Sequence, residues 1–245
     1  MAAGPPIPRP VDGLPGAPAP WSQLPEERRK AITINEVQLA LAAVPRAVDG
    51  SAAVPAWERV TPAELPSGVD ARPAAVLCLL FEKDGEANVV LTRRAAHLRS
   101  HSGEVSFPGG RLQPDEPPLH AALREANEEI GVDVGSVEVI GELTPLTTVR
   151  SPVLVRCFVG RWNVPRPDIA FAADPAEVEK VFSVPLADLA RQGVYHEELW
   201  PSLEDQAHTT YRAVAFFHLE DDIVWGATGR LLTELVGAVL GRRTG

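Results

Sequence analysis

Three glutamates in the middle of the chain, Glu125, Glu128 and Glu129, have the spacing of a metal-binding helix face. An α-helix turns about 100° per residue, so the three side chains fall within an arc of roughly 100°. Carboxylates crowded in this way repel one another unless a cation lies among them, and their hard oxygen atoms suit Mg²⁺ or Mn²⁺. The spacing therefore predicts a divalent-metal site, against the alternative of a solvated acidic face on an amphipathic helix.

The helix that must position these carboxylates is expected over about residues 117–130. Its first turn tolerates the prolines of residues 117–118, whose missing N–H groups cost nothing there, and Gly131 suits its C-cap. Arg124 precedes Glu128 by four residues and can brace it as an ion pair along the helix. An apolar stripe with i, i+3, i+4, i+7 spacing should pack into the core. The stripe consists of Leu119, Ala122, Leu123, Ala126 and Ile130.

The segment that contains these residues, 110–132, reads GRLQPDEPPLHAALREANEEIGV. It resembles the Nudix box, GX5EX7REUXEEXGU, at every fixed position. The resemblance implies an α/β/α Nudix sandwich with a mixed sheet. It also implies a hydrolase that cleaves nucleoside diphosphates linked to another moiety. Glu125, Glu128 and Glu129 would hold the metal, with the Gly110 carbonyl as a further ligand.

The resemblance leaves the general base open. Glu128 or Glu129 is one candidate. Glu177 is another, because some Nudix enzymes draw their base from a loop after the box; the alternative for Glu177 is a residue that starts a helix. Glu116 and Arg124 are expected to orient the other carboxylates and not to ligate the metal directly.

The segment directly before the box, residues 90–110, reads VLTRRAAHLRSHSGEVSFPGG. It resembles the signature of the coenzyme A pyrophosphatase subfamily, LLTXR(S/A)X3RX3GX3FPGG, with Val90 in place of leucine as the one departure. The resemblance implies hydrolysis of coenzyme A or acyl-coenzyme A to 3′,5′-ADP and 4′-phosphopantetheine. Arg94, Arg99 and Gly103 stand at its fixed positions and are expected to bind the substrate. Arginine forks match phosphate geometry, and glycine lets backbone approach a ligand closely.

Three further basic or titratable residues, Arg93, His97 and His101, lie in the same segment. For the arginine the alternative to phosphate binding is bracing of an acidic loop, and for the histidines a structural role is the stronger interpretation.

Two other functions compete with coenzyme A hydrolysis. The first is a Nudix hydrolase of another substrate, such as ADP-ribose or a dinucleotide, because substrates change readily within one fold. The second is a non-catalytic Nudix sensor or regulator. Such a protein would be expected to lack box glutamates or to carry a DNA-binding domain. All the box glutamates are present, and the Pro-rich leader does not suit a winged helix.

Composition limits the partners. The chain has 245 residues, a net charge of −10 and a sequence pI near 5.1. An acidic surface argues against non-specific binding to nucleic acid or to anionic membranes. No apolar run is long enough to span a membrane, and no signal peptide is evident. We therefore expect a small-molecule nucleotide substrate; a homodimer is compatible with the sequence.

The two cysteines, Cys78 and Cys157, each lie in an apolar, strand-like run. Isolated cysteines of this kind are best interpreted as small core residues. This composition fits a reducing cytoplasm.

The prolines divide the chain in two. Residues 1–70 are expected to form a Pro/Ala-rich extension with one short helix, and residues 71–245 the Nudix domain. Within the extension, residues 1–31 form a flexible or extended arm with too few apolar side chains to order itself. Thr33 and Glu36 make a capping box that opens the short helix.

Periodicity places the remaining elements. Strands are expected at 75–81 and 87–92 around the turn KDGE, and at 137–143, 153–162 and 209–219; helices are expected at 187–192 and 226–240.

Overall fold

The computed structural model describes residues 7–43, 72–98, 102–148, 153–163, 171–202 and 210–241. These residues form two sheets, and the larger sheet includes the strand at which the box begins. Its central strands run in the order β4-β3-β2-β8-β6, with β5, β7 and β9 attached to β2, β8 and β3. β2 and β8 pair in parallel and the other pairs are antiparallel, so the predicted mixed sheet is confirmed. The strands are β2 Arg72–Lys83, β3 Glu86–Arg94, β4 Val105–Ser106, β5 Gly109–Arg111, β6 Val137–Glu142, β7 Leu146–Thr147, β8 Val153–Trp162 and β9 Val178–Pro185.

The β2–β3 hairpin confirms the strands predicted around KDGE. Asp84 and Gly85 form its turn with φ angles of 53° and 79°. Two consecutive positive φ angles are typical of the type I′ turn, whose twist matches that of the flanking strands. The hairpin aligns β3 so that its end, at Arg94, reaches the box helix.

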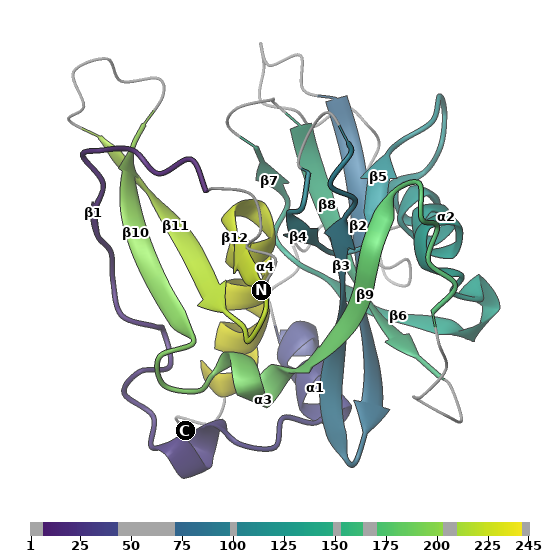
Figure 1. Cartoon of the computed structure of the whole chain (residues 1–245). Coiled ribbons are helices and arrows are strands. Elements are labelled where there is room, and N and C mark those ends of the chain that lie inside the picture. The colour runs from purple at the N-terminus through teal and green to yellow at the C-terminus, as the bar shows by residue number, and fades with distance from the viewer. Residues whose placement is uncertain are drawn as a thin grey trace, which may run out of the picture.

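The box helix, α2 (Pro118–Ile130), packs against one face of this sheet. Ala122, Ala126 and Ile130 are buried, as the predicted stripe requires, with Leu119 and Leu123 partly buried beside them. Gly131 ends the helix in the left-handed conformation, with φ 72°, and its N–H donates to the Asn127 carbonyl. The opposite face of the sheet packs against α4 (Gly226–Gly241), so helices cover both faces (Figure 1).

A second sheet, which the sequence did not predict, lies on the far side of α4 (Figure 1). Its order is β1-β10-β11-β12, formed by β1 Leu14–Pro15, β10 Tyr195–Pro201, β11 Tyr211–His218 and β12 Ile223–Trp225. β11 confirms the strand predicted at 209–219, but it belongs to this sheet. The helix predicted at 187–192 is shorter and earlier: α3 spans Leu186–Leu189.

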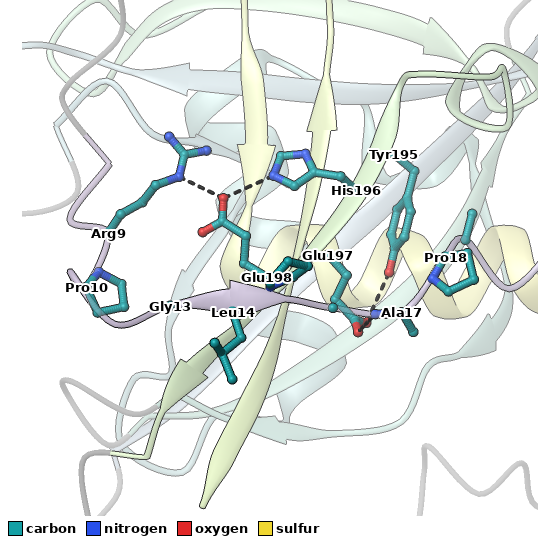
Figure 2. A pocket seen from close by; sticks show the side chains of 13 residues that line it. Arg9, Pro10, Gly13, Leu14, Ala17, Pro18, Tyr195, His196, Glu197 and Glu198 are labelled. Atoms are coloured by element: carbon teal, nitrogen blue, oxygen red, sulfur yellow. Dashed lines mark hydrogen bonds and ion pairs between the residues drawn. The ribbon is translucent and has the colours of Figure 1, made fainter.

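Residues 7–31 of the predicted arm have a defined path, because they pack on the second sheet and are held by contacts outside the arm. Trp21 is only 2% exposed and packs edge-on against Tyr195 and beside Phe217. Upstream of it, β1 pairs with β10 and lies along its edge (Figure 2). One large aromatic anchor and a strand edge with free hydrogen-bonding groups are sufficient to order a segment of poor apolar content.

The rest of the described extension joins the same core. A 3₁₀ turn, η1 (Glu26–Arg29), leads to α1 (Ile34–Ala43), whose Ile34, Val37 and Leu41 are buried. The predicted capping box is confirmed: the Glu36 carboxylate accepts from Thr33 N–H, and the Thr33 hydroxyl accepts from Glu36 N–H. Within the described residues, no helix combines the length and apolar character needed to cross a membrane.

Candidate active site

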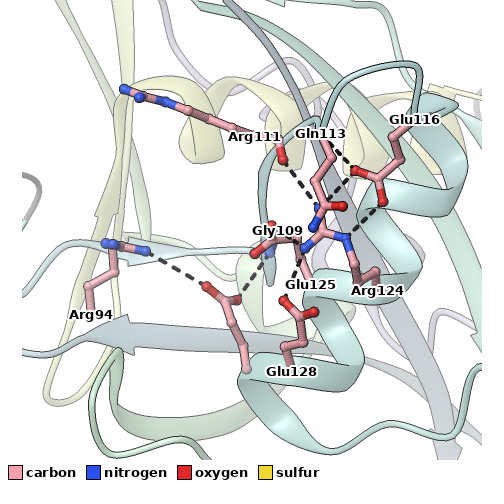
Figure 3. Close-up of polar contacts among 9 residues, drawn as sticks. Arg94, Gly109, Arg111, Gln113, Glu116, Arg124, Glu125 and Glu128 are labelled. Carbon is pink, nitrogen blue, oxygen red and sulfur yellow. Dashed lines mark hydrogen bonds and ion pairs between the residues drawn. The ribbon is translucent and has the colours of Figure 1, made fainter.

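Glu129 is the most enclosed carboxylate of the predicted site. It projects from α2 towards the loop before β5, and its side chain is 5% exposed. The Gly109 N–H donates to Oε2 at 3.1 Å, and Arg94 Nη1 lies 3.8 Å from Oε1. The helix thus presents Glu129 between Gly109, at the start of β5, and Arg94, at the end of β3. Figure 3 labels Gly109 and Arg94.

The pKa of Glu129 is raised to about 7, chiefly by burial, with smaller contributions from the charges of Glu125 and Glu177. The Gly109 N–H and the Arg94 guanidinium lower it, but they do not outweigh the loss of solvent. The negative charge at this position is therefore under-compensated by the protein's own groups, which is the electrostatic condition that a bound cation would correct.

Arg124 holds the other box carboxylates (Figure 3). Its Nε and Nη2 donate to the two oxygens of Glu116 at 2.8 and 2.9 Å. Its Nη1 donates to Glu125 at 2.7 Å and to Glu128 at 3.0 Å, which confirms the predicted pair along the helix. Glu128 is 57% exposed at the side chain and stays accessible from solvent. The hydrogen bond from Arg124 is the largest cause that lowers the pKa of Glu116.

The two glycines of the FPGG segment allow close contacts: Gly109 is required by backbone on its Cβ side, whereas Gly110 faces the end of the Glu125 side chain. A Cβ at Gly110 would lie 2.5 Å from the Glu125 carboxylate, and a Cβ at Gly109 would lie 2.5 Å from the backbone of β2. The backbone at Gly110 therefore lies directly against Glu125, where a carbonyl and a carboxylate can share a ligand. An all-oxygen donor set beside an under-compensated carboxylate fits a hard divalent cation.

As the side chains stand, no three His, Cys, Asp or Glu residues of the described segments are close enough to enclose an ion. The reason is visible in the contacts: Arg124 holds Glu125 and Glu128, while Glu129 faces the Gly109 N–H. Metal binding would require Glu125 and Glu128 to turn from Arg124 towards Glu129.

The residues expected to bind substrate are placed in part. Arg94 lies beside Glu129. Gly103 adopts φ 68° in a turn, and the Gly103 N–H donates to the Arg94 carbonyl at 3.0 Å. Arg99 and His101 lie outside the described residues. His97 contacts the Ala176 carbonyl through Nε2 at 3.0 Å, which is a structural role.

Glu177 does not start a helix, contrary to the alternative considered for it. It directly precedes strand β9, and its carbonyl accepts from the Ala95 N–H at 2.8 Å. The Glu177 N–H donates to the Asp174 carbonyl at 3.1 Å, and the Asp174 N–H donates to the Glu129 carbonyl at 3.0 Å. The backbone therefore links Glu177 to the end of the box helix, and the charge of Glu177 makes a small contribution to the raised pKa of Glu129.

One acidic residue near this cluster was missed in the sequence. Asp222, in the turn before β12, accepts two hydrogen bonds from Arg93, so this arginine does not face the box carboxylates. The only signal in the sequence was the acidic run at residues 220–222, which is equally typical of a solvated turn.

A family model described as the NUDIX domain matches residues 71–206. The chain is 37% identical over 169 residues to the uncharacterized Nudix hydrolase NudL of Photorhabdus laumondii, across 69% of this chain and 85% of the relative. It is 36% identical over 165 residues to NudL of Escherichia coli K12, across 67% and 81%. Among solved structures, a MutT/nudix family protein from Enterococcus faecalis aligns with a TM-score of 0.46 and 18% identity, over 77% of this chain and 71% of that one.

Proposed function

This chain belongs to the Nudix hydrolases, which act on pyrophosphate bonds in nucleoside diphosphate derivatives, and we propose that its substrate is coenzyme A or an acyl-coenzyme A. The products would be 3′,5′-ADP and 4′-phosphopantetheine or its acyl form. One observation supports this choice most directly. Arg94, a fixed position of the coenzyme A signature, lies 3.8 Å from Glu129 of the box, so the two motifs meet at one point.

The proposed roles of the box residues follow from this contact between Arg94 and Glu129. Glu125, Glu128, Glu129 and the Gly110 carbonyl would hold Mg²⁺ or Mn²⁺, and Arg124 would orient the carboxylates. When bound, the cation would neutralise the diphosphate and acidify the attacking water.

The basic groups serve the substrate. Arg94 and Arg99 would bind its phosphates, with Gly103 shaping the loop between them. The proton of the attacking water would pass to Glu128, Glu129 or Glu177. The backbone link from Glu177 through Asp174 to Glu129 supports Glu177 as a candidate.

Two further features belong to the same proposal. The Nudix domain would span residues 71–245; the family match over residues 71–206 supports its start. The enzyme would work in the cytoplasm, which is supported by Cys78 and Cys157 being buried free thiols.

The experiment that tests the substrate is a product analysis by mass spectrometry. Purified full-length protein would be incubated with Mg²⁺ or Mn²⁺ and a mixture of coenzyme A, ADP-ribose, NADH and diadenosine polyphosphates. We expect coenzyme A to be consumed fastest, with 3′,5′-ADP and 4′-phosphopantetheine as products. The Glu128→Gln protein is the negative control. Faster consumption of ADP-ribose or a dinucleotide would overturn the choice of coenzyme A and leave the hydrolase assignment standing.

A further inference from the structure

A buried ion pair joins the end of β3 to the second sheet. Arg93 Nε and Nη2 donate to the two oxygens of Asp222 at 2.7 and 2.8 Å. The side chains are 12% and 6% exposed. Asp222 belongs to the turn between β11 and β12, and β12 lies next to β4 (Figure 1). A bidentate pair shielded from water has a fixed geometry, so it sets the relative position of the two strands that carry it.

The same pair lies at an irregularity in the pairing of β3 with β9. Arg93 is opposite Lys180, but Arg94 is opposite Val178, so Glu179 is an extra residue in β9. In a regular strand, neighbouring side chains point to opposite faces. Here Glu179 Oε1 lies 3.3 Å from Arg93, and Lys180 Nζ lies 3.7 Å from Asp222. Both side chains therefore point to the Arg93 side, as a β-bulge allows.

The bulge has a consequence for the active site. Because Glu179 is inserted, the part of β9 before it is displaced by one residue relative to β3. After this displacement the Ala95 N–H bonds the Glu177 carbonyl, and Arg94 Nη1 lies 3.8 Å from Glu129. Glu177 is itself linked to Glu129 through the backbone of Asp174. Without the bulge, Arg94 would be opposite Glu179 and the contacts around Glu129 would change.

We propose that Asp222 is a positioning residue for the active site: through Arg93 it holds the bulge that keeps Arg94 beside Glu129 and aligns Glu177 with Ala95. Arg93 occupies an unspecified position of the coenzyme A signature, so the family resemblance assigns it no role. The inference rests on the proposed function only for the identity of the substrate. Its effect on the carboxylate cluster follows from the contacts alone.

The test compares Asp222→Asn with a matched control, Glu198→Gln. Glu198 also belongs to the second sheet and also pairs with an arginine, Arg9 Nε at 2.8 Å, but that arginine is in the N-terminal arm and not in β3. Two quantities would be measured on the full chain: Mn²⁺ affinity by electron paramagnetic resonance, and kcat/KM for the diphosphate that the wild type hydrolyses best. Urea unfolding would show the stability change of each variant.

We expect Asp222→Asn to weaken Mn²⁺ binding and to lower kcat/KM, each by about tenfold, the lower end of the range for groups that bond metal ligands directly, because Asp222 acts through Arg93. Glu198→Gln should leave both within about twofold, even where urea shows a comparable loss of stability. Equal Mn²⁺ affinities and equal kcat/KM in the two variants would overturn the proposal.

A second variant keeps the test decisive if Asp222→Asn does not fold. Arg93→Lys keeps the charge but loses the two-pronged geometry. It should weaken Mn²⁺ binding by a smaller factor in the same direction, and an unchanged affinity would overturn the proposal. Because Mn²⁺ binding is measured without substrate, a failure of the coenzyme A assignment would not affect this result.

Discussion

Glu129 and Glu198 are both largely shielded from water, yet their surroundings act on them in opposite directions. Burial raises the pKa of Glu129 to about 7, because the Gly109 N–H and Arg94 compensate too little of its charge. Burial also acts to raise the pKa of Glu198, but hydrogen bonds from Trp200, His196 and Arg9 outweigh it and hold the pKa below its ordinary value. The difference lies in burial, since the side chains are 5% and 20% exposed, and in the number of hydrogen-bond donors.

The region around Glu198 is built to hold the arm. Arg9 Nε, His196 Nε2 and Trp200 Nε1 reach its two oxygens at 2.8, 3.1 and 2.7 Å, and the first two contacts are visible in Figure 2. His196 stacks on Phe216, and Arg9 lies over the same ring. A polar cluster with this many partners stabilises the fold. A carboxylate with a deficit of partners, such as Glu129, destabilises the metal-free fold and is suited to chemistry.

The largest effect that we predict concerns the region of the arm. Trp21→Ala should lower the free energy of unfolding by about 3–5 kcal/mol, because it removes a buried aromatic side chain and leaves a cavity. Urea unfolding measures this. The control is Val11→Ala, since Val11 is fully exposed and its loss should stay within about 0.5 kcal/mol. If the folded fraction of the Trp21 variant keeps its kcat, the arm stabilises the fold without contributing to catalysis; a loss of kcat would erase the distinction between the two regions.

The box carboxylates should give the next effect. Glu128→Gln or Glu129→Gln keeps the side-chain size and removes one anionic ligand, so turnover should fall more than a hundredfold, or at least ~3 kcal/mol of barrier. Initial rates at saturating Mg²⁺, with circular dichroism to verify folding, measure this. Glu198→Gln serves as the control and should keep its rate. Near wild-type rates for both box variants would contradict the assignment of Glu128 and Glu129 as metal ligands.

A smaller effect is expected from the arginines of the coenzyme A signature. Arg94→Ala and Arg99→Ala should each lower kcat/KM for coenzyme A, because each removes a charge-assisted hydrogen bond to phosphate. The corresponding rise in the activation barrier should be roughly 1.5–3 kcal/mol. Dephospho-coenzyme A identifies the phosphate involved: if it is the 3′-phosphate, variant and wild type should cleave this analogue nearly equally. Full kcat/KM in both variants would mean that the motif braces the loop.

The sequence predicted the parts of the fold that are determined by residues close together in the chain. The Asp84–Gly85 turn needs residues that accept positive φ, and its neighbours alternate as paired strands do. Helix α2 follows from its apolar stripe and from Gly131 at its end. The spacing of the box glutamates also placed them on one helix face.

The parts that were missed depend on contacts between distant residues. The burial of Glu129 requires Gly109 and Arg94 to fold over it, and the periodicity of α2 cannot reveal this. Strand β10 reads YHEELWP, and neither of its faces is uniformly apolar, so alternation did not reveal it. Arg93 and Asp222 are 129 residues apart, and either one alone is typical of a solvated charge.

The raised pKa of Glu129 predicts the direction in which the free energy of unfolding changes with pH, and this direction can be measured. A carboxyl whose pKa is raised by folding destabilises the folded state once pH exceeds its unfolded pKa, and the penalty is complete above the folded pKa. For Glu129 the folded state loses stability as the pH rises from 4.5, the ordinary pKa of the carboxyl, to about 7. This loss amounts to at most roughly 3 kcal/mol at pH 8. Bound metal should remove the penalty and add its own stabilisation.

Thermal unfolding of wild type and Glu129→Gln at pH 8, with EDTA and then with Mn²⁺, therefore tests the central claim most directly. We predict a crossover. In EDTA the variant should have the higher Tm, because it lacks the uncompensated charge. In Mn²⁺ the wild type should have the higher Tm, because only its carboxylate cluster is complete. A variant that is less stable than wild type in EDTA, or a wild type whose Tm does not respond to Mn²⁺, would contradict the account.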